Sequence, residues 1–182
     1  MSKRILVTGF SGVGKSTVTG KLREMGQVAY DLDDIPGLFT ATHQKTGEVF
    51  TSWDNSDPDT GKNLRWECDK EKLRRLIADE PAELAFYCGS ASNIFDLLEL
   101  FDKTIVLTAS HDSIRHRLTN RTNNDYGRTK EIQDHILERK DAGDQKLIEC
   151  GAITVDAERS IDEVVGEVVR VGVGMDSGSR PE

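Results

Sequence analysis

Eight residues near the N-terminus carry the groups best suited to chemistry. Residues 9–16 read Gly-Phe-Ser-Gly-Val-Gly-Lys-Ser, which fits the P-loop pattern G-x-x-x-x-G-K-[ST]. Glycine backbones let successive N–H groups point at one phosphate, and the positive end of a following helix strengthens that field. Lys15 would place a cation on the β- and γ-phosphates, and the Ser16 hydroxyl would ligate Mg²⁺. The residues assigned to a bound nucleoside triphosphate from this motif are Gly9, Ser11, Gly12, Val13, Gly14, Lys15, Ser16 and Thr17.

The segments on either side of this motif are those that must position it. Residues 4–8 form a β-branched, apolar run typical of a buried strand. Residues 15–25 carry Val18, Leu22 and Met25 at helical spacing. Because the pattern sits between a strand and a helix, nucleotide binding is favoured over a glycine-rich turn without a ligand.

A cluster of acids follows the second predicted strand, residues 27–31. Asp31, Asp33 and Asp34 would lie at the carboxyl end of that strand, facing the phosphate site. A carboxylate there can accept the proton of a substrate hydroxyl or hold metal-bound water. We predict Asp33 as the catalytic base and Asp31 as a substrate contact and a metal ligand beside the P-loop serine. A solvated acidic turn is the alternative, and the choice among the three acids stays open.

Small polar residues follow the third predicted strand, residues 83–88. Gly89 would allow close backbone approach, and Ser90 would hydrogen-bond a substrate. Ser92 and Asn93 would do the same or would cap the next helix. No acid ends this strand, so the usual Walker B carboxylate is absent and the metal role moves to the acids after the second strand.

Arginines cluster in the region 117–130. Arg117 and Arg121 are four residues apart and would share one helix face, while Arg128 follows the polar, turn-rich segment 122–127. Such a segment would suit a mobile lid that brings positive charge to a transferring phosphoryl group. We predict Arg117 and Arg121 as catalytic, with Arg117 also a nucleotide contact, and Arg128 as a substrate contact. A solvated face with ordinary surface arginines is the alternative.

The last chemically suggestive segment is residues 155–160. Ala157 and Arg159 would line a nucleobase, largely through the backbone, although a plain helix start at Ser160 explains the sequence equally well.

Strand-like and helix-like segments alternate along the chain, which predicts an α/β fold. We expect a three-layer P-loop sandwich in which a central five-stranded parallel sheet has helices on both faces. The expected strands are 4–8, 27–31, 83–88, 103–108 and 152–155. The expected helices are 15–25, 67–79, 92–100, 110–121, 130–149 and 160–170.

One domain, residues 1–170, accounts for this pattern, and residues 171–182 are expected to be a flexible tail. Residues 40–66 interrupt the alternation as a polar insert on the substrate side, and Trp53 and Trp66 favour partial order there. Either Trp would stack on a substrate ring or pack in a core.

Composition narrows the classes of function. The 182 residues carry a net charge of −8, which argues against a nucleic-acid-binding surface. No apolar run is long enough to span a membrane, and three widely spaced cysteines suit a reducing cytoplasm. The four histidines, at 43, 111, 116 and 135, have no zinc-site spacing and are expected to be surface or structural residues.

With these motifs in view, the chain resembles the small P-loop kinases of the adenylate kinase and shikimate kinase group. The loop 9–16 matches their phosphate-binding loop, and residues 117–121 (Arg-Leu-Thr-Asn-Arg) look like the R-L-x-x-R that begins their lid. Residues 31–33 are similar to the D-x-D of shikimate kinases, and residues 155–164 look like the segment bordering the adenine. The similarity in layout covers about residues 3–170.

The resemblance implies that Lys15 and Ser16 bind phosphate and Mg²⁺. It places Asp31 and Asp33 toward the acceptor and the metal, and the two lid arginines at the nucleotide or its γ-phosphate. The Asp-Gly-x-Pro-Arg of nucleoside monophosphate kinases is replaced by Cys-Gly-Ser at 88–90, and the insert offers little arginine. Both departures disfavour an acceptor that is itself a nucleotide.

We therefore expect a cytoplasmic, ATP-dependent phosphotransferase that uses Mg²⁺ and acts on a hydroxyl of a small molecule. It would be a monomer or a homodimer without a nucleic-acid or membrane partner. A nucleoside or nucleotide kinase is the nearest alternative, and a nucleotide-binding switch or regulatory ATPase is the alternative of another class.

Overall fold

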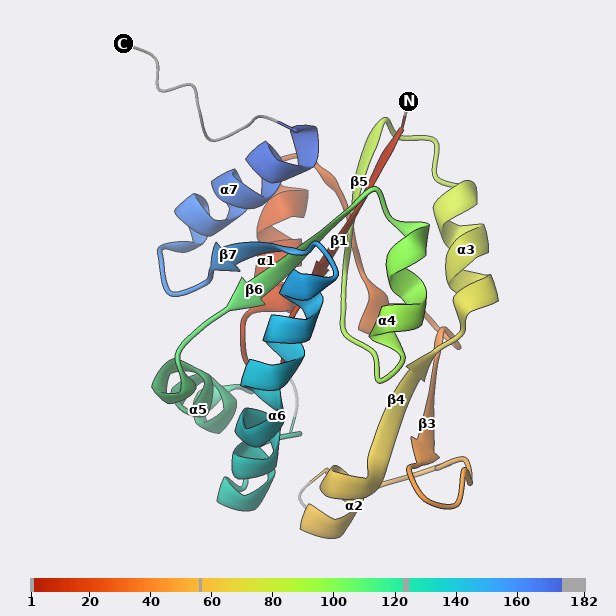
Figure 1. Ribbon diagram of the computed structural model, residues 1–182, viewed down its shortest axis with the longest axis vertical. Helices are drawn as coiled ribbons and strands as arrows, with labels where there is room; N and C mark the ends of the chain where they lie inside the picture. The colour runs from red at the N-terminus through yellow and green to blue at the C-terminus, as the bar shows by residue number, and fades with distance from the viewer. Residues whose placement is uncertain (1, 56, 123–124, 175–182) are drawn as a thin grey trace.

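A parallel sheet of five strands forms the centre of the molecule (Figure 1). The computed structural model describes residues 2–55, 57–122 and 125–174. The sheet order is β2-β5-β1-β6-β7, so β1 lies between β5 and β6. The strands are β1 (Lys3–Thr8), β2 (Val28–Asp31), β5 (Leu84–Cys88), β6 (Lys103–Thr108) and β7 (Ile153–Asp156). All four pairings are parallel, which confirms the predicted α/β sandwich.

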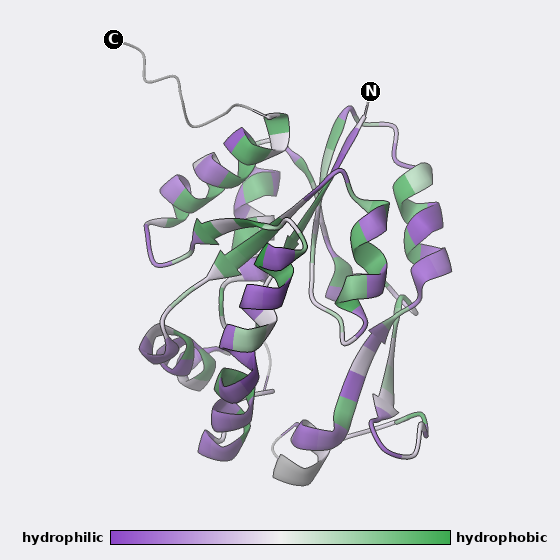
Figure 2. Ribbon diagram, in the orientation of Figure 1, coloured by the Kyte–Doolittle hydropathy of each residue, from purple (hydrophilic) through white to green (hydrophobic). Residues whose placement is uncertain are grey.

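Helices cover both faces of this sheet. The helices are α1 (Lys15–Glu24), α2 (Pro58–Asn63), α3 (Lys70–Ala78), α4 (Ile94–Leu97), α5 (His111–Asn120), α6 (Lys130–Glu149) and α7 (Ile161–Val173). Alternate residues of β1 face opposite sides: Ile5 and Val7 pack with α1 and α7, whereas Leu6 packs with α3 and α4. Figure 2 shows the central strands mainly green and the outer helices carrying purple turns. The two apolar layers fix the sheet, and with it the carboxyl ends of the strands.

Side-chain caps explain where several helices begin. The hydroxyl of Ser160 accepts from the backbone N–H of Glu163, whose carboxylate returns a bond to the backbone N–H of Ser160. Thr129 caps α6 and Ser110 caps α5. In each case the hydroxyl accepts a hydrogen bond from the backbone N–H three residues later. These local signals are readable in the sequence, which is why most predicted helices lie within three residues of their observed bounds.

The C-terminal helix is longer than predicted. It runs to Val173 and ends at Gly174 in the left-handed conformation, and Val171 is buried. The expected tail boundary at residue 171 is therefore wrong, because apolar side chains continue the helical pattern. The rest of that tail, residues 175–182, lies outside the described residues, as do positions 123–124 of the expected lid.

Part of the polar insert forms an antiparallel hairpin. Strand β3 (Phe39–His43) pairs with β4 (Leu64–Cys68), with Ala41 opposite Trp66. The predicted helix 67–79 is wrong at its start, because residues 64–68 form β4 and α3 begins only after Asp69 caps it. The hairpin stands beside the carboxyl edge of the sheet, across from α6 (Figure 1).

Two other expectations changed in detail. The predicted helix 92–100 is a short α4 followed by a 3₁₀ turn over Leu98–Leu100. The three cysteines are free, with Cys68 and Cys88 buried and Cys150 exposed. Within the described ranges, no helix combines the length and the apolar character that a membrane span requires.

Candidate active site

The P-loop is held tightly against the end of β6. Gly9 has φ of 142°, and a Cβ atom at this position would lie 2.6 Å from the carbonyl oxygen of Leu107. No residue other than glycine fits that space without moving the backbone. Gly12 and Gly14 also have positive φ, and Gly14 is the residue from which α1 starts. The loop thus adopts a backbone that its glycines alone allow.

Lys15 bends back over this loop. Its ammonium donates to the carbonyl oxygens of Gly9 at 2.8 Å and of Phe10 at 3.2 Å. Burial lowers the pKa of Lys15, while the negative charges of Asp33 and Asp31 act in the opposite direction. The lysine therefore lies within the electrostatic reach of both predicted acids.

Two arginines from the end of α5 reach the P-loop. The guanidinium of Arg117 donates to the carbonyl oxygens of Val13 at 2.9 Å and of Ala157 at 2.7 Å. It therefore joins the P-loop to the turn after β7. Arg121 donates to the hydroxyl of Ser11 at 3.3 Å, and burial lowers its pKa. Both residues contact the P-loop, and their contacts with a nucleotide stay predictions.

Arg128 is placed differently. It forms an ion pair with Asp125 at 2.8 Å and donates to the carbonyl oxygen of Arg121 at 3.0 Å. It is absent from the lining of the cleft described below. Its predicted contact with the substrate would need the segment to move.

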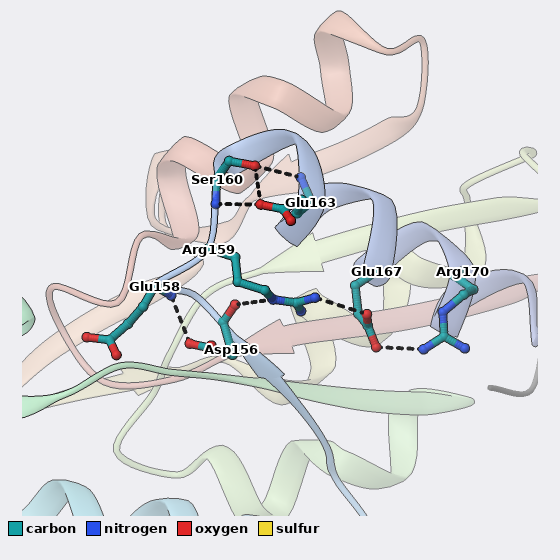
Figure 3. Close-up of polar contacts among 7 residues, drawn as sticks. All are labelled: Asp156, Glu158, Arg159, Ser160, Glu163, Glu167 and Arg170. Atoms are coloured by element: carbon teal, nitrogen blue, oxygen red, sulfur yellow. Dashed lines mark hydrogen bonds and ion pairs between the residues drawn. The ribbon is translucent and has the colours of Figure 1, made fainter.

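The turn after β7 is built from its own polar groups (Figure 3). The side chain of Arg159 lies along α7, where it contacts Glu167 at 3.5 Å, and Glu167 also pairs with Arg170. Arg159 also donates from Nε to the carbonyl oxygen of Asp156 at 3.4 Å, so it is engaged both within the turn and with α7. The contacts of Ala157 and Arg159 with a nucleobase stay predictions.

Glu158 links that turn to the start of α5. Its carboxylate accepts from the hydroxyls of Ser110 and Ser113 and from the backbone N–H of Ser110. These hydrogen bonds lower the pKa of Glu158 to about 2. The helix that carries Arg117 is therefore tied to the turn that Arg117 contacts.

The acids after β2 lie at the expected edge of the sheet. Asp31 is the buried last residue of β2, and its carboxylate accepts from the backbone N–H of Asp33 at 3.3 Å. Asp33 faces the cleft, and its Oδ1 accepts from the indole N–H of Trp66 at 2.9 Å. Enclosure raises the pKa of Asp33, whereas the hydrogen bond from Trp66 and the charge of Lys15 lower it.

The loop after β5 has a structural role that the sequence reading did not separate from binding. A Cβ atom at Gly89 would lie 2.8 Å from Cβ of Leu32, so this glycine is needed for packing. Ser92 exchanges hydrogen bonds with the backbone of Trp66, and Asn93 does so with Cys68. Ser92 and Asn93 therefore dock the hairpin onto the core.

A cleft of about 580 Å³ opens above Lys15 between the hairpin and α6. Ser90 lines it, as do Thr8, the last residue of β1, and Gly9, the first residue of the P-loop. Its aromatic lining residues are Phe10, Trp53, Trp66, Phe95 and Tyr126. Its ionisable lining residues are Lys15, Asp33, Asp34, His135 and Arg139. The cleft brings the phosphate-binding loop and Asp33 together in one space.

One face of α6 contributes groups that the sequence reasoning missed. His135, Arg139 and Gly143 follow one another at intervals of four residues and all line the cleft. Arg139 is exposed and forms no hydrogen bond or ion pair with any residue that the structure describes. Burial and the charge of Arg139 lower the pKa of His135. The four-residue spacing was visible, but nothing local marked this face as facing the cleft.

Two oxygen donors at the carboxyl edge of the sheet are candidates for Mg²⁺. Ser16, the second residue of α1, has an exposed side chain, and Asp31 is the last residue of β2. Among the described residues no group of three or more His, Cys, Asp or Glu side chains could hold a metal alone. Mg²⁺ commonly binds through one or two protein oxygens together with substrate phosphates, which this arrangement fits.

Comparison with known protein families finds one family model that matches this chain. The model of the AAA domain family matches residues 5–138 of the 182. The match includes the P-loop, the acids after β2 and the whole of the expected lid region 117–130. The chain therefore belongs to the AAA domain family. No curated protein matches it.

Solved structures of small kinases share the fold. A shikimate kinase from Acinetobacter baumannii, in complex with shikimate, superposes with a TM-score of 0.61 at 17% identity, covering 97% of this chain and 96% of that one. A deoxyadenosine kinase from M. mycoides with bound dATP gives 0.57 at 12% identity, covering 92% and 98%. A gluconokinase from Sinorhizobium meliloti 1021 gives 0.52 at 20% identity, covering 95% of each chain. These similarities confirm the small P-loop kinase fold.

Proposed function

We propose that this member of the AAA domain family is a phosphotransferase that moves the γ-phosphoryl group of Mg-ATP to a hydroxyl group of a small molecule. The observation that carries the proposal is one cleft lined by both Lys15 and Asp33. A phosphate-binding cation and a candidate base share the space in which two substrates would meet. Three structural neighbours, a deoxyadenosine kinase, a gluconokinase and a shikimate kinase, support the same reaction class.

The residues divide the work of phosphoryl transfer. The backbone N–H groups of the P-loop and the ammonium of Lys15 would hold the phosphates, exchanging the carbonyl contacts of Lys15 for phosphate oxygens. Arg117 and Arg121 would add positive charge where negative charge spreads over the transferring group. Mg²⁺, held by Ser16 and Asp31 with phosphate oxygens, would neutralise further charge there.

Asp33 would act on the second substrate. Its carboxylate would accept the proton of the acceptor hydroxyl while the hydroxyl oxygen forms its bond to the γ-phosphorus. The bond from the γ-phosphorus to the bridging oxygen breaks, and ADP leaves. The aromatic walls of the cleft would exclude water, so that the acceptor outcompetes hydrolysis.

The α6 face favours an acceptor that carries an acidic group. Arg139 presents a positive charge to the cleft without a partner among the described residues. An exposed guanidinium suits a planar anion such as a carboxylate, which it can bind through two parallel hydrogen bonds. Asp33 and Arg139 would then contact the hydroxyl and the anion of one molecule.

Two other functions remain alternatives. A nucleoside or nucleotide kinase would place a base against the aromatic residues of the same cleft. A regulatory ATPase or switch would use the P-loop without a small acceptor.

The test is ADP formation from Mg-ATP with a panel of nucleosides, nucleotides, sugars, sugar acids, cyclic hydroxy acids and aminoglycosides. We expect slow basal hydrolysis that one class of acceptor raises by orders of magnitude. A flat panel in the presence of measurable ATP binding would favour the regulatory alternative.

A further inference from the structure

One side-chain hydrogen bond connects the hairpin to the acid that would act as base. The indole N–H of Trp66, on β4, donates to Oδ1 of Asp33 at 2.9 Å. The two residues are 33 positions apart in the chain and come from separate elements. An indole N–H is a donor only, so this contact fixes one carboxylate oxygen and leaves the other unoccupied by Trp66.

The indole is itself held in place from several sides. Its ring stacks on Phe39 with centroids 5.1 Å apart and planes 3° apart, and the edge of Trp53 lies 6.0 Å away. The backbone N–H of Trp66 donates to the hydroxyl of Ser92, and the backbone carbonyl of Trp66 accepts from the backbone N–H of Ser92. A ring fixed by stacking and a backbone fixed to the core make a donor with little freedom of its own.

Asp33 shares the cleft with a positive charge, the ammonium of Lys15. The charges of Lys15 and Asp33 influence each other, yet the two form no ion pair within 4.0 Å in the described part of the chain. A carboxylate that rotates freely in the same cleft as an ammonium would turn toward it, because opposite charges attract. In that ion pair, Asp33 would be unavailable to the acceptor hydroxyl and Lys15 would be unavailable to the phosphates.

We propose that Trp66 is a positioning residue that holds Asp33 away from Lys15 and directs its second carboxylate oxygen toward the acceptor. The inference rests on the proposed function for the role of Asp33 as base. The hairpin, through Trp66 on β4, would thus keep the candidate base apart from the phosphate-binding cation. Trp66 itself transfers no proton.

The test is a double-mutant cycle on ATP affinity, which needs no acceptor. Trp66→Phe keeps an aromatic ring against Phe39 but removes the N–H donor. We expect it to weaken binding of a non-hydrolysable ATP analogue with Mg²⁺ by about tenfold, since Asp33 would pair with Lys15 and compete with phosphate. Asp33→Asn added to Trp66→Phe should restore the affinity, because the amide has no charge with which to pair.

A packing control separates positioning from mere stability. Phe39→Leu removes the stacking partner but keeps the indole donor, and any loss of affinity that it causes should not be restored by Asp33→Asn. If Trp66→Phe leaves ATP affinity unchanged, or if Asp33→Asn fails to restore it, the proposed positioning role is wrong.

A spectroscopic signature gives a second, independent readout. In amide and indole ¹H–¹⁵N spectra, Asp33→Ala should move the indole resonance of Trp66 and leave that of Trp53, whose N–H bonds to Asn55, in place. An unmoved Trp66 resonance would contradict the hydrogen bond. Failure of the phosphotransferase proposal would show instead as a flat acceptor panel, so the two ideas fail in different experiments.

Discussion

The two halves of the cleft are built in different ways. The proposed nucleotide half consists of one continuous segment, the P-loop with the start of α1, and Arg117 connects this segment to the turn after β7. The proposed acceptor half gathers residues from the turn after β2, the hairpin, the loop after β5 and α6. One half is therefore local in sequence, and the other exists only after the chain has folded.

This difference explains which residues sequence reasoning found. A contiguous motif carries its own evidence, because the same eight residues supply the backbone shape, the cation and the hydroxyl. Trp66, His135 and Arg139 have no such motif, and their approach to Asp33 depends on how the hairpin and α6 pack. The comparison also predicts that changes in the two halves will have separable effects on the two substrates.

The largest effect should come from the nucleotide half. Lys15→Ala removes the cation that would hold the β- and γ-phosphates, and we expect ATP turnover to fall by at least about 100-fold together with ATP affinity. Calorimetric titration with an ATP analogue and Mg²⁺, alongside ADP formation, measures both. Unchanged affinity and activity would contradict the P-loop assignment.

The second effect separates the halves most directly. Asp33→Asn keeps the shape and the hydrogen-bond acceptor for Trp66 but removes the base, and we expect turnover with the acceptor to fall by about 10² to 10⁴ while ATP affinity is retained. Steady-state kinetics with both substrates provide the measurement. Normal turnover would reduce Asp33 to a polar turn residue.

A smaller effect is expected from α6. Arg139→Ala should raise the KM of an acidic acceptor by about tenfold and leave ATP affinity unchanged, because it removes one charged hydrogen-bond donor from the acceptor half. An acceptor analogue in which an amide replaces the acid is the matched control and should respond little to the variant. If the variant changes the KM of both acceptors equally, Arg139 does not recognise the anion.

The smallest effect concerns stability in the nucleotide half. The pKa of Glu158 is lowered from 4.5 to about 2 by Ser110 and Ser113, so its ionised form stabilises the folded state. That stabilisation is fully present above pH 4.5 and is lost as the pH falls toward 2. Glu158→Gln should therefore be less stable than the unsubstituted protein at neutral pH, and the difference should shrink across this window.

Chemical denaturation at several pH values measures this difference. A gap between the two proteins that stays constant from pH 7 to pH 3 would show that the ionised carboxylate contributes nothing to the contact between α5 and the turn after β7.

Much of the fold was accessible from sequence because its signals are local. Apolar runs gave the five strands, and capping residues such as Ser160 and Thr129 marked helix starts. The hairpin was missed as strands because residues 39–43 and 64–68 mix polar and apolar side chains and face each other across a long connection. Residues 67–68 were drawn into the following helix because the strand ends only two residues before α3 begins.

The sequence by itself determined the P-loop, the five strands of the central sheet, and the placing of Asp31 and Asp33 at the carboxyl edge of that sheet. Each depends on neighbours within a few residues or on the periodicity of apolar side chains. Only the tertiary structure decided that Trp66 bonds to Asp33, that Ser92 and Asn93 dock the hairpin, and that Arg139 faces the cleft. The physical reason is that these contacts join segments whose relative positions are set by packing of the two apolar layers, and no local pattern encodes that packing.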